Sequence, residues 1–523
     1  MMPEEHRTAA CSGWDALAAG AETVWLPTAD EMGKLDQEAV ASGATTERTL
    51  IEAAGREIAR RIQLHWPEGP VVAVAGRGHN GADALVALRT LRAWGREVRA
   101  ILSSPTPPDP DVLIGWNIPL EEPESLADAC AGASVLLDGI LGTGVTGAPR
   151  EPQASLIERI NRLNVPVAAV DGPSGADFST GAVAGACIRA TLTVSLGWPN
   201  IGLLRHPARE YCGRLECVEI GFPPPSEPMR ARAITGRWVA RMLIDRAPDS
   251  HKGRAGYLVL IAGQSGMAGA AALGARAALR GGVGILKVVG DPANREILQR
   301  TCPGAIYVSW DDEEESAEAV GWAGALAIGP GLGRSEARKN LVERVLDSRG
   351  VIPAVIDADG LSVFEGELDR LSGFLTPSDV VTPHPGELAR LTGEPLEGML
   401  RDLPGVAAEA AEALGCTVLL KGAPSWVAES GNPLRVSTTG GPEVASGGTG
   451  DVLTGLIGAY LAGGMSAADA SSAALWLIGV AAGRSTSPSG HLASDIPDRL
   501  PGVRSHVSRL GTARGPVLFV SER

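Results

Sequence analysis

A glycine-rich stretch late in the chain could bind phosphate and ends in an acid. In ASGGTGDVLTGLIGAYLAGG (445–464), Gly447, Gly448 and Gly450 come just before an apolar helical pattern, and the next residue is Asp451. Glycines let an anion approach the backbone N–H groups of a helix N-terminus. The carboxylate could accept a proton from a substrate hydroxyl that attacks a phosphoryl group. The alternative is a plain glycine turn before a helix that favours Asp in its first turn. Glycines lose much conformational entropy on folding, so a run this rich in them is a costly way to begin a helix. The pattern therefore favours phosphoryl transfer.

Loops after other strand-like runs could complete this site. Lys421 in LLKGAPS suits a nucleotide phosphate, although it could also be a surface lysine, and AIGPGLG (327–333) is a turn whose backbone could touch a ligand. Asp357 and Asp359 lie in IDADGL, and His384 and Glu387 lie in TPHPGELARL. Zinc binding by the last two is possible, but two ligands are too few, and Glu387 is equally suited to a helix N-terminus.

A second glycine-rich turn, GRGHNGAD (76–83), follows an apolar strand and begins a helix, which is the dinucleotide-binding pattern. The next strand, EVRAILSSP, ends in serine rather than in the acidic residue that would bind a ribose. A turn that only packs a helix on a sheet needs the glycines but not His79, Asn80 and Asp83. These polar groups therefore favour a ligand site.

Two more acids end strand-like runs in this half. Asp138 precedes the phosphate-sized loop GILGTGVTG, and Asp171 precedes GPSG. A single Asp at a strand end is usually a cap or turn residue. Acidic or polar groups at three successive strand ends are better explained by one site, because α/β sheets bind ligands at the carboxyl ends of their strands.

The elements that position these loops alternate between strand and helix patterns, which predicts an α/β fold. The 523 residues are too many for one core, and the Pro-rich GFPPPSEP (221–228) is the best boundary, so we expect domains 1–228 and 229–523. The run DDEEES (311–316) is expected to be a solvated loop.

Bulk composition narrows the class of protein. A net charge of −15 and no basic cluster argue against nucleic acid or an acidic membrane as partner. Seven scattered cysteines without a CxxC pair fit a reducing cytoplasm, and no apolar run is long enough for a membrane span. We expect a cytoplasmic protein that acts on small molecules and forms a homo-oligomer.

The ordered motifs GxGxNGxD, LDxxLGTGxxG and VDxPSG, followed by TLTVSLG and EIGFP, resemble the NAD(P)H-hydrate epimerase domain over roughly residues 26–224. The resemblance implies a Rossmann-like fold and a potassium ion held by Asn80, Asp138 and Ser174. Asp171 could stabilise the cation formed when water leaves the ring, or carry the proton. The implied substrate contacts are His79, Asn80, Gly81, Ala82, Asp83, Gly142, Thr143, Gly144, Val145, Thr146, Gly147, Ala148 and Asp171.

This sequence departs from the epimerase pattern at four positions. His79 and Ala82 replace an asparagine and a glycine in the first turn. Gly172 replaces an apolar residue after Asp171, and Asn200 in GWPNIG stands where the family usually has lysine. The missing lysine affects cation stabilisation or phosphate binding.

The motifs HKGRAGYLVLIAGQSGMAGAA, GPGLG, DADGL, TPHPGE, LLKGA and GGTGD resemble the ADP-dependent NAD(P)H-hydrate dehydratase over about residues 235–500. That family is ribokinase-like, which implies two three-layer α/β/α domains for the chain. The reaction phosphorylates the hydrate hydroxyl with ADP and Mg²⁺ and then expels phosphate. Implied substrate contacts are Ala270, Gly333, His384 and the catalytic Asp451; nucleotide contacts are Lys421, Gly422, Ala423, Pro424, Ser425, Gly447, Gly448, Thr449 and Gly450.

Together the halves resemble a fused enzyme that repairs hydrated NADH and NADPH (NADHX and NADPHX), in which epimerisation brings the R form to a dehydratase for the S form. Two alternatives remain open. The second half could be a vitamin or sugar kinase, because the GGTGD helix start is shared by that superfamily. The first half could be a nucleotide-binding module without catalysis, as its altered turn and Asn200 suggest.

Overall fold

The chain folds into two compact units. The computed structural model describes residues 21–105, 108–144, 146–243, 249, 252–483, 490–507 and 517–521. The first unit comprises Met1–Thr235 and Thr512–Arg523, and the second Gly236–Gly511. The end of the chain thus joins the first unit, which the expected domains 1–228 and 229–523 did not anticipate.

The sheet of the first unit is parallel except at one edge. Its order is β18-β7-β6-β5-β4-β1-β2-β3, and only β18 runs antiparallel to its neighbour. The central strand β1 pairs through Val71 with Val98 of β2 and Val135 of β4. The strands are β1 (Val71–Ala75), β2 (Val98–Leu102), β3 (Leu120–Glu121), β4 (Val135–Gly139), β5 (Val167–Val170), β6 (Leu192–Leu196), β7 (Arg214–Val218) and β18 (Val517–Ser521).

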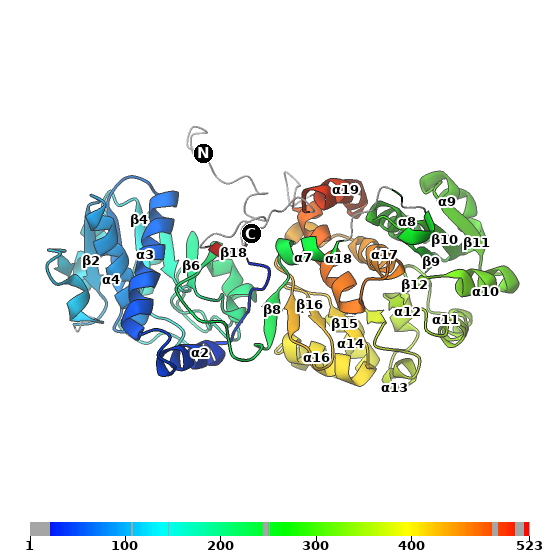
Figure 1. The fold of residues 1–523 in the computed structure, drawn as a ribbon, viewed down its shortest axis with the longest axis horizontal. Coiled ribbons are helices and arrows are strands. Elements are labelled where there is room, and N and C mark those ends of the chain that lie inside the picture. The colour runs from blue at the N-terminus through cyan, green and yellow to red at the C-terminus, as the bar shows by residue number, and fades with distance from the viewer. Residues whose placement is uncertain are drawn as a thin grey trace. The chain divides into compact units, whose positions relative to one another are not determined.

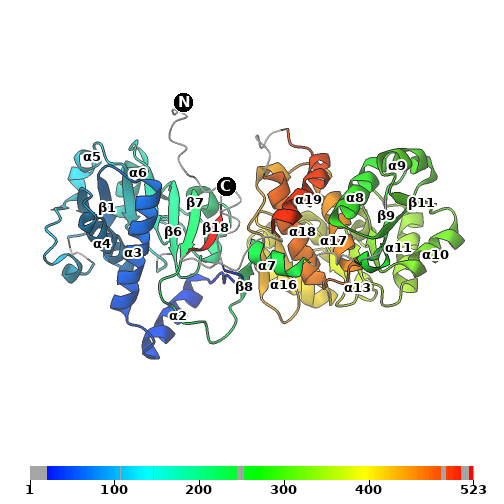
Figure 2. The ribbon, with the colours of Figure 1, turned by 45° about the horizontal axis from the view of Figure 1, so that its top comes forward.

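Helices cover both faces of this sheet (Figures 1 and 2). They are α2 (Ala29–Ala41), α3 (Glu47–His65), α4 (His79–Ala93), α5 (Leu126–Ala129) and α6 (Gln153–Asn161). Along β1, Val71 and Ala73 belong to a core with residues of α3 and α4, whereas Val72 and Val74 belong to a core with residues of α5 and α6. Since successive strand residues point to opposite faces, the unit has three layers. The expected α/β/α arrangement is confirmed here.

The second unit is also built on a largely parallel sheet. The strand order β11-β10-β9-β12-β13-β14-β15-β16-β17 is parallel up to β15 and ends in antiparallel β16 and β17. The strands are β9 (Tyr257–Ile261), β10 (Ile285–Gly290), β11 (Ala305–Ser309), β12 (Ala325–Ile328), β13 (Ala354–Ile356), β14 (Val380–Val381), β15 (Thr417–Leu420), β16 (Trp426–Ala428) and β17 (Leu434–Val436); β8 (Ala231–Ala233) precedes this unit and forms a bridge with Trp25.

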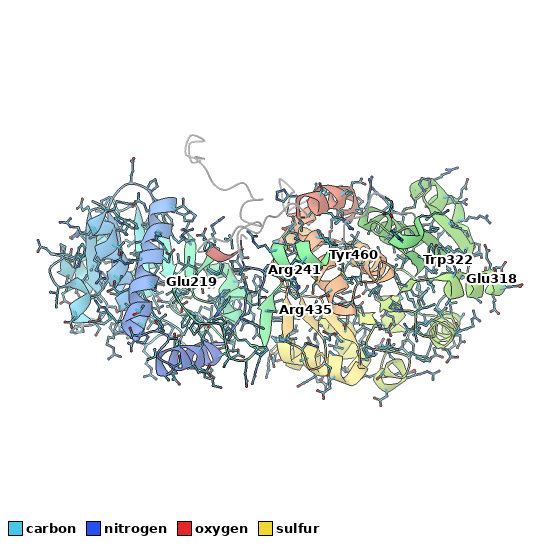
Figure 3. All side chains as sticks on the ribbon, in the orientation of Figure 1. Glu219, Arg241, Glu318, Trp322, Arg435 and Tyr460 are labelled. Atoms are coloured by element: carbon cyan, nitrogen blue, oxygen red, sulfur yellow. The ribbon has the colours of Figure 1, made fainter. Side chains whose placement is uncertain are left out.

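Helices pack on this sheet and on one another. Helix α17 contacts α8, α18, β9 and β12, and α16 contacts β15 and β16. Arg435 of β17, labelled in Figure 3, donates to Asp469 of α18 over 2.6 Å and so ties the antiparallel edge to a helix. The helices are α7 (Gly236–Met242), α8 (Ala268–Gly281), α9 (Arg295–Thr301), α10 (Glu313–Trp322), α11 (Glu336–Ser348), α12 (Asp359–Ser362), α13 (Leu368–Ser372), α14 (Pro385–Thr392), α15 (Leu396–Met399), α16 (Leu403–Leu414), α17 (Thr449–Ala462), α18 (Ala467–Ala482) and α19 (Ile496–Val507).

We expected the acidic run DDEEES to form a solvated loop, but most of it belongs to helix α10. Asp312 caps α10, and its Oδ1 accepts the backbone N–H of Glu315 over 2.9 Å. Three glutamates then occupy the first helical turn, where the helix dipole favours negative charge. The prediction was wrong because the run was judged by its charge rather than by its position at a helix start.

Within the described residues, no helix is both long and apolar enough to cross a membrane.

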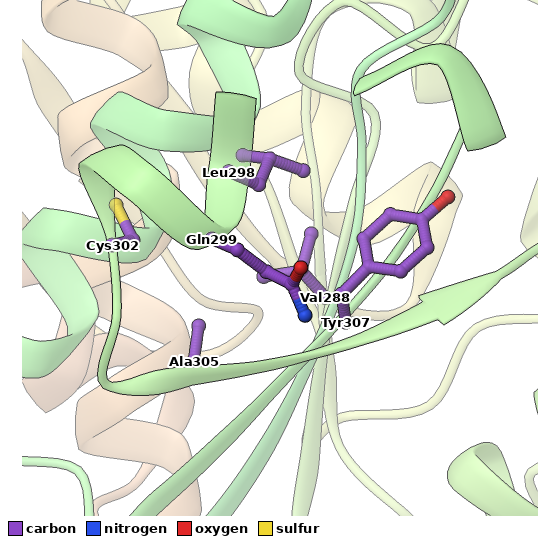
Figure 4. Close-up of a pocket in the computed structure, with 6 residues that line it drawn as sticks. All are labelled: Val288, Leu298, Gln299, Cys302, Ala305 and Tyr307. Atoms are coloured by element: carbon purple, nitrogen blue, oxygen red, sulfur yellow. The ribbon is translucent and has the colours of Figure 1, made fainter. Parts of the chain in front are cut away.

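A small hollow lies beside α9 and β11 (Figure 4), lined by Val288, Leu298, Gln299, Cys302, Ala305 and Tyr307. None of the loop residues singled out from the sequence lines this hollow.

Candidate functional site

In the first unit, the polar loops meet at the carboxyl ends of β1, β4 and β5, which are neighbours in the sheet. Asn80 lies in the first turn of α4 after β1, Asp138 near the end of β4, and Ser174 just after β5. Asn80 Nδ2 donates to the carbonyls of Leu141 (3.2 Å) and Val170 (2.8 Å). The side chain therefore links the loops of all three strands.

Asp138 and Ser174 are in direct contact. The Asp138 carboxylate accepts the Ser174 hydroxyl over 2.6 Å and the Ser174 N–H over 2.8 Å, and Leu141 N–H donates to the Ser174 hydroxyl oxygen over 2.9 Å. Asp138 is fully buried, and burial raises its pKa to about 6 against the opposing effect of these hydrogen bonds. The structure thus brings together the three residues that the sequence resemblance assigns to a cation.

Asp171 is the second buried acid of this region. Its backbone has a left-handed φ of 65°. Oδ1 accepts the N–H of Leu196, at the end of β6, over 3.1 Å. Burial, together with the negative charge on Asp36, raises the Asp171 pKa to about 7 against the opposing effect of the hydrogen bond from Leu196. A carboxyl with this pKa can both donate and accept a proton near neutral pH.

Asp83 and Asp36 extend this acidic group. Asp83, in the N-terminal half of α4, is 5% exposed, and its pKa is raised well above the usual value by burial and by Asp171 and Asp36. Asp36 lies half-buried on α2, and burial also raises its pKa. Sequence reasoning missed Asp36 because it lies in an ordinary amphipathic helix pattern far before the loops.

The remaining predicted contacts lie at the rim. His79 is exposed and pairs with Glu47 of α3 over 2.8 Å. Gly142 and Thr143 are half-buried; Gly144, Thr146, Gly147 and Ala148 are exposed. Val145 lies outside the described residues. This loop leaves accessible backbone beside the buried acids.

Close backbone approaches explain the glycines of the first turn. A Cβ at Gly76 would lie 1.9 Å from the Ile140 carbonyl oxygen, and one at Gly81 would lie 2.2 Å from the Gly76 carbonyl oxygen. A Cβ at Gly142 would lie 2.4 Å from Asn80 Oδ1. A side chain at Gly76 or Gly81 would collide with the backbone, and one at Gly142 would displace the Asn80 side chain from its hydrogen bonds.

Three of the four residues that depart from the epimerase pattern are buried. Ala82 is 2% exposed within α4, and Gly172 lies against the ring of Phe178. Asn200 is fully buried, and neither polar atom of its side chain has a hydrogen-bond partner among the described residues. A buried amide without a partner is costly, so Asn200 is available to a ligand or a water molecule.

In the second unit, the predicted residues come from loops along one edge of adjacent parallel strands. The loops follow β9, β12, β13, β14 and β15, which are neighbours in that order. The first turn of α17 completes the set. This is the edge at which α/β sheets bind ligands.

An ion pair between half-buried Lys421 and buried Asp357 lies at the centre of this edge. Lys421 Nζ is 2.6 Å from Asp357 Oδ1 and 3.5 Å from Glu387 Oε2, and Thr454 of α17 donates to Asp357 Oδ2 over 2.7 Å. A Cβ at Gly450 would lie 3.4 Å from Asp357 Oδ2 and 3.8 Å from Lys421 Nζ. The ammonium is therefore fixed beside the glycine turn that the sequence assigns to phosphate.

Asp451 lies in the first turn of α17 beside this pair. Burial raises its pKa to about 6, negative charge on Asp357 raises it, and the Lys421 ammonium lowers it. The preceding Gly448 has a left-handed φ of 95°, which favours glycine. Asp451 can thus change protonation state near neutral pH.

The other predicted residues surround this centre. Gly333 N–H donates to Asp359 over 2.9 Å, and a Cβ at Gly331 would lie 3.0 Å from the Cβ of Ala270 in α8. His384 caps α14 and exchanges hydrogen bonds with Glu387 in a capping box. Gly422, Ala423, Pro424 and Ser425 form the turn between β15 and β16, while Gly447, Gly448 and Thr449 lead into α17.

Comparison with known proteins matches both units. The family model described as YjeF-related protein N-terminus matches residues 47–202, and that described as NAD(P)H-hydrate dehydratase matches residues 258–501. The bifunctional NAD(P)H-hydrate repair enzyme of Moorella thermoacetica is 34% identical over 92% of this chain and 96% of its own length. That of Escherichia coli (strain K12) is 33% identical over 88% of this chain and 89% of its own.

A solved structure also matches part of the chain. The ADP/ATP-dependent NAD(P)H-hydrate dehydratase from Bacillus subtilis, co-crystallised with ATP/Mg²⁺, is 29% identical, with a TM-score of 0.46 over 52% of this chain and 97% of its own. Because the full-length relatives match almost the whole sequence, with both family models in order, this chain belongs to the family of bifunctional NAD(P)H-hydrate repair enzymes.

Proposed function

We propose that the second unit dehydrates the S form of hydrated NADH or NADPH with ADP. The observation that supports this is the position of Asp451 beside the Lys421–Asp357 pair at the glycine-rich start of α17. Asp451 accepts the proton of the hydrate hydroxyl as its oxygen attacks the terminal phosphoryl group of ADP, and AMP leaves. The phosphate ester then loses phosphate, and loss of a ring proton restores the double bond. Phosphate is a far better leaving group than hydroxide.

Lys421 and the glycine turn suit the charge that develops in this step. The ammonium, held by Asp357 and Glu387, would stabilise negative charge on the phosphoryl oxygens. Backbone N–H groups at the start of α17 would bind the phosphate. Residues Lys421 to Ser425 and Gly447 to Gly450 would contact the nucleotide, and Ala270, Gly333 and His384 the hydrate.

Mg²⁺ would enter with the nucleotide phosphates. The donor set fits it, because Asp357 and Glu387 both present carboxylate oxygens beside Lys421, and Mg²⁺ takes one or two carboxylates besides phosphate and water. When bound, it would neutralise phosphate charge.

We propose that the first unit interconverts the R and S hydrates. Epimerisation requires the hydroxyl to leave as water and water to return on the other face of the ring. Asp171, with a pKa of about 7, would donate the first proton and stabilise the ring cation. The loops at 79–83 and 142–148 would hold the rest of the dinucleotide.

A potassium ion would be held by Asn80, Asp138 and Ser174. The fit rests on the fully buried Asp138 carboxylate, on the Ser174 hydroxyl bonded to it, and on the carbonyls of Leu141 and Val170 that meet at the Asn80 amide. In the described part of the chain no group of three or more His, Cys, Asp or Glu side chains is arranged to bind a metal. The donor set thus suits a weakly charged hard cation, whose role would be to fix the loops.

One assay tests both activities. Purified full-length protein is incubated with mixed NADH hydrates and either ADP or ATP, and the absorbance of regenerated NADH is followed. We expect complete conversion with ADP. Conversion that stops once the S form is consumed would reject the epimerase assignment in favour of a binding module. Phosphorylation of a vitamin or sugar without NADH formation would reject the dehydratase assignment. Light scattering of the same sample tests the expected homo-oligomer.

A further inference from the structure

Helix α2 lies over the loops that follow β5 and β6. The backbone N–H of Ala29 donates to the Ser179 hydroxyl over 2.9 Å, and Ile201 N–H donates to the carbonyl of Pro27 over 2.9 Å. Met32 Cε lies 3.4 Å from where a Cβ at Gly197 would be. Gly197 follows Leu196, whose N–H binds the Asp171 carboxylate. The helix is therefore fixed next to Asp171.

Asp36 is one turn after Met32 on the same face of α2, because residues i and i+4 are neighbours on a helix surface. It interacts electrostatically with Asp171 and Asp83, and also with His79 and Glu47 at the rim. Asp171 is anchored at the sheet edge by Leu196, whereas Asp36 comes from the helix above the loops. The two carboxyl groups thus come from different elements, and the charge on Asp36 acts on Asp171.

The surroundings of α2 contain a buried acid and a buried amide. Asp83 is 5% exposed, and the charges of Asp171 and Asp36 act on it. Asn200, which precedes Ile201 at the hydrogen bond to Pro27, is fully buried, and both polar atoms of its side chain lack hydrogen-bond partners among the described residues. Unpaired buried polar groups are rare, because each costs the desolvation of a hydrogen-bonding group. They indicate a polar or positively charged ligand at this place.

Inversion at the hydroxyl-bearing carbon needs proton transfer on two faces of one ring. A single carboxyl on one face can expel water and return it only to that face, unless the ring turns over in the site. A second carboxyl on the opposite face removes that requirement. We propose that Asp36 is a second acid–base residue of the epimerase, and that it serves the ring face opposite to Asp171.

In the proposed cycle, which rests on the epimerase function above, protonated Asp171 gives its proton to the hydroxyl. The C–O bond breaks, water leaves, and the ring nitrogen lone pair stabilises the cation. Water adds to the other face as its proton passes to the Asp36 carboxylate. One proton has moved from Asp171 to Asp36, so the enzyme is now set for the reverse epimerisation or resets by exchange with solvent.

Oxygen exchange tests this assignment. Separated R and S NADH hydrates are incubated without nucleotide in ¹⁸O-labelled water with full-length Asp36→Asn, Asp171→Asn or unchanged protein. The unchanged protein should interconvert the epimers and label both. Asp36→Asn should slow interconversion by about 10²-fold or more but still exchange the hydroxyl of one epimer. Asp171→Asn should retain exchange of the other epimer only.

Controls separate this role from a structural one. Asp36→Glu keeps a carboxyl and should recover part of the interconversion, and Glu38→Gln removes a charge from the exposed side of α2 and should change nothing. The proposal is overturned if Asp36→Asn behaves like the unchanged protein, loses exchange of both epimers equally, or if Asp83→Asn gives the one-sided pattern instead. Absence of interconversion and exchange in the unchanged protein overturns the epimerase function itself.

Discussion

The ring of Phe178 occupies the space beside Gly172. A Cβ at Gly172 would lie 2.2 Å from Phe178 Cζ, and Phe178 is 3% exposed. Gly172 has no left-handed φ, so the ring, rather than the backbone, excludes a side chain there. The departure from the usual apolar residue after Asp171 is therefore matched by a large side chain six residues later.

This pairing predicts strong coupling between the two positions. Gly172→Ile alone should destabilise the first unit by roughly 1–3 kcal/mol through overpacking, and Phe178→Ala by about 3–5 kcal/mol through a cavity. The double variant should lose less than the sum, by about 0.5–3 kcal/mol. Urea dependence of amide hydrogen exchange in β5 and β6 measures each value. Additive losses of stability would show that the Phe178 ring does not occupy the space of a side chain at position 172.

Asp451→Asn should lower dehydration of the S hydrate by about 10²–10⁴-fold, because the variant cannot accept the hydroxyl proton. Interconversion of the epimers without nucleotide should not change, since the first unit carries it. Initial rates of NADH formation give the first result, and chromatography of the epimers gives the second. A folded variant with near-normal dehydration would remove Asp451 from its role as base.

The pH profile offers an independent check of the same residue. Burial raises the Asp451 pKa to about 6, so the basic carboxylate is lost as pH falls through that value. The acid limb of kcat/KM for dehydration should therefore lie near pH 6 rather than near the usual 3.8 of an aspartate. Asp357→Asn removes a negative neighbour that raises this pKa and should move the limb to lower pH. An unchanged limb in that variant would assign it to another group.

Much of the site was predictable because its residues follow strands directly. Asn80, Asp138, Asp171, Lys421 and Asp451 each lie at a strand end or helix start that the local pattern reveals. The parallel order of neighbouring strands then brings these ends to one edge of each sheet. The α/β class followed from the same alternation of strand and helix patterns.

What the sequence did not reveal depends on contacts between distant segments. The charge on Asp36 acts on Asp171 because α2 packs against a loop more than a hundred residues later. Strand β18 joins β7, and Arg209 binds Ser521 across 312 positions. The sequence of an edge strand does not reveal which sheet the strand extends. Likewise, the sequence around an acid on a helix does not reveal which residues the acid faces.

Potassium should stabilise the first unit. A cation bound to the folded state alone raises its stability with concentration, and Asp138 supplies the buried negative charge. Potassium chloride should therefore raise the thermal midpoint of the first unit more than choline chloride at equal ionic strength. Asp138→Asn should abolish the difference, and Asp128→Asn, at an exposed position, should keep it. If both salts raise the thermal midpoint of the unchanged protein equally, Asn80, Asp138 and Ser174 do not bind potassium.

The end of the chain should matter to the first unit and not to the second. A chain that ends at Gly511 lacks β18 and exposes the edge of β7, together with the surface that buried Phe519 covers. Burial of one such side chain contributes about 1.5–3 kcal/mol, and each kcal/mol shifts the midpoint by about 2–4 °C in a domain of this size. The truncated chain should thus lose thermal stability and epimerisation in the first unit but dehydrate the S hydrate normally. Phe519→Ser in the full chain should give a smaller shift of the same kind. If truncation instead removes dehydration and spares epimerisation, the end of the chain serves the second unit, and the pairing of β18 with β7 has no part in the epimerase.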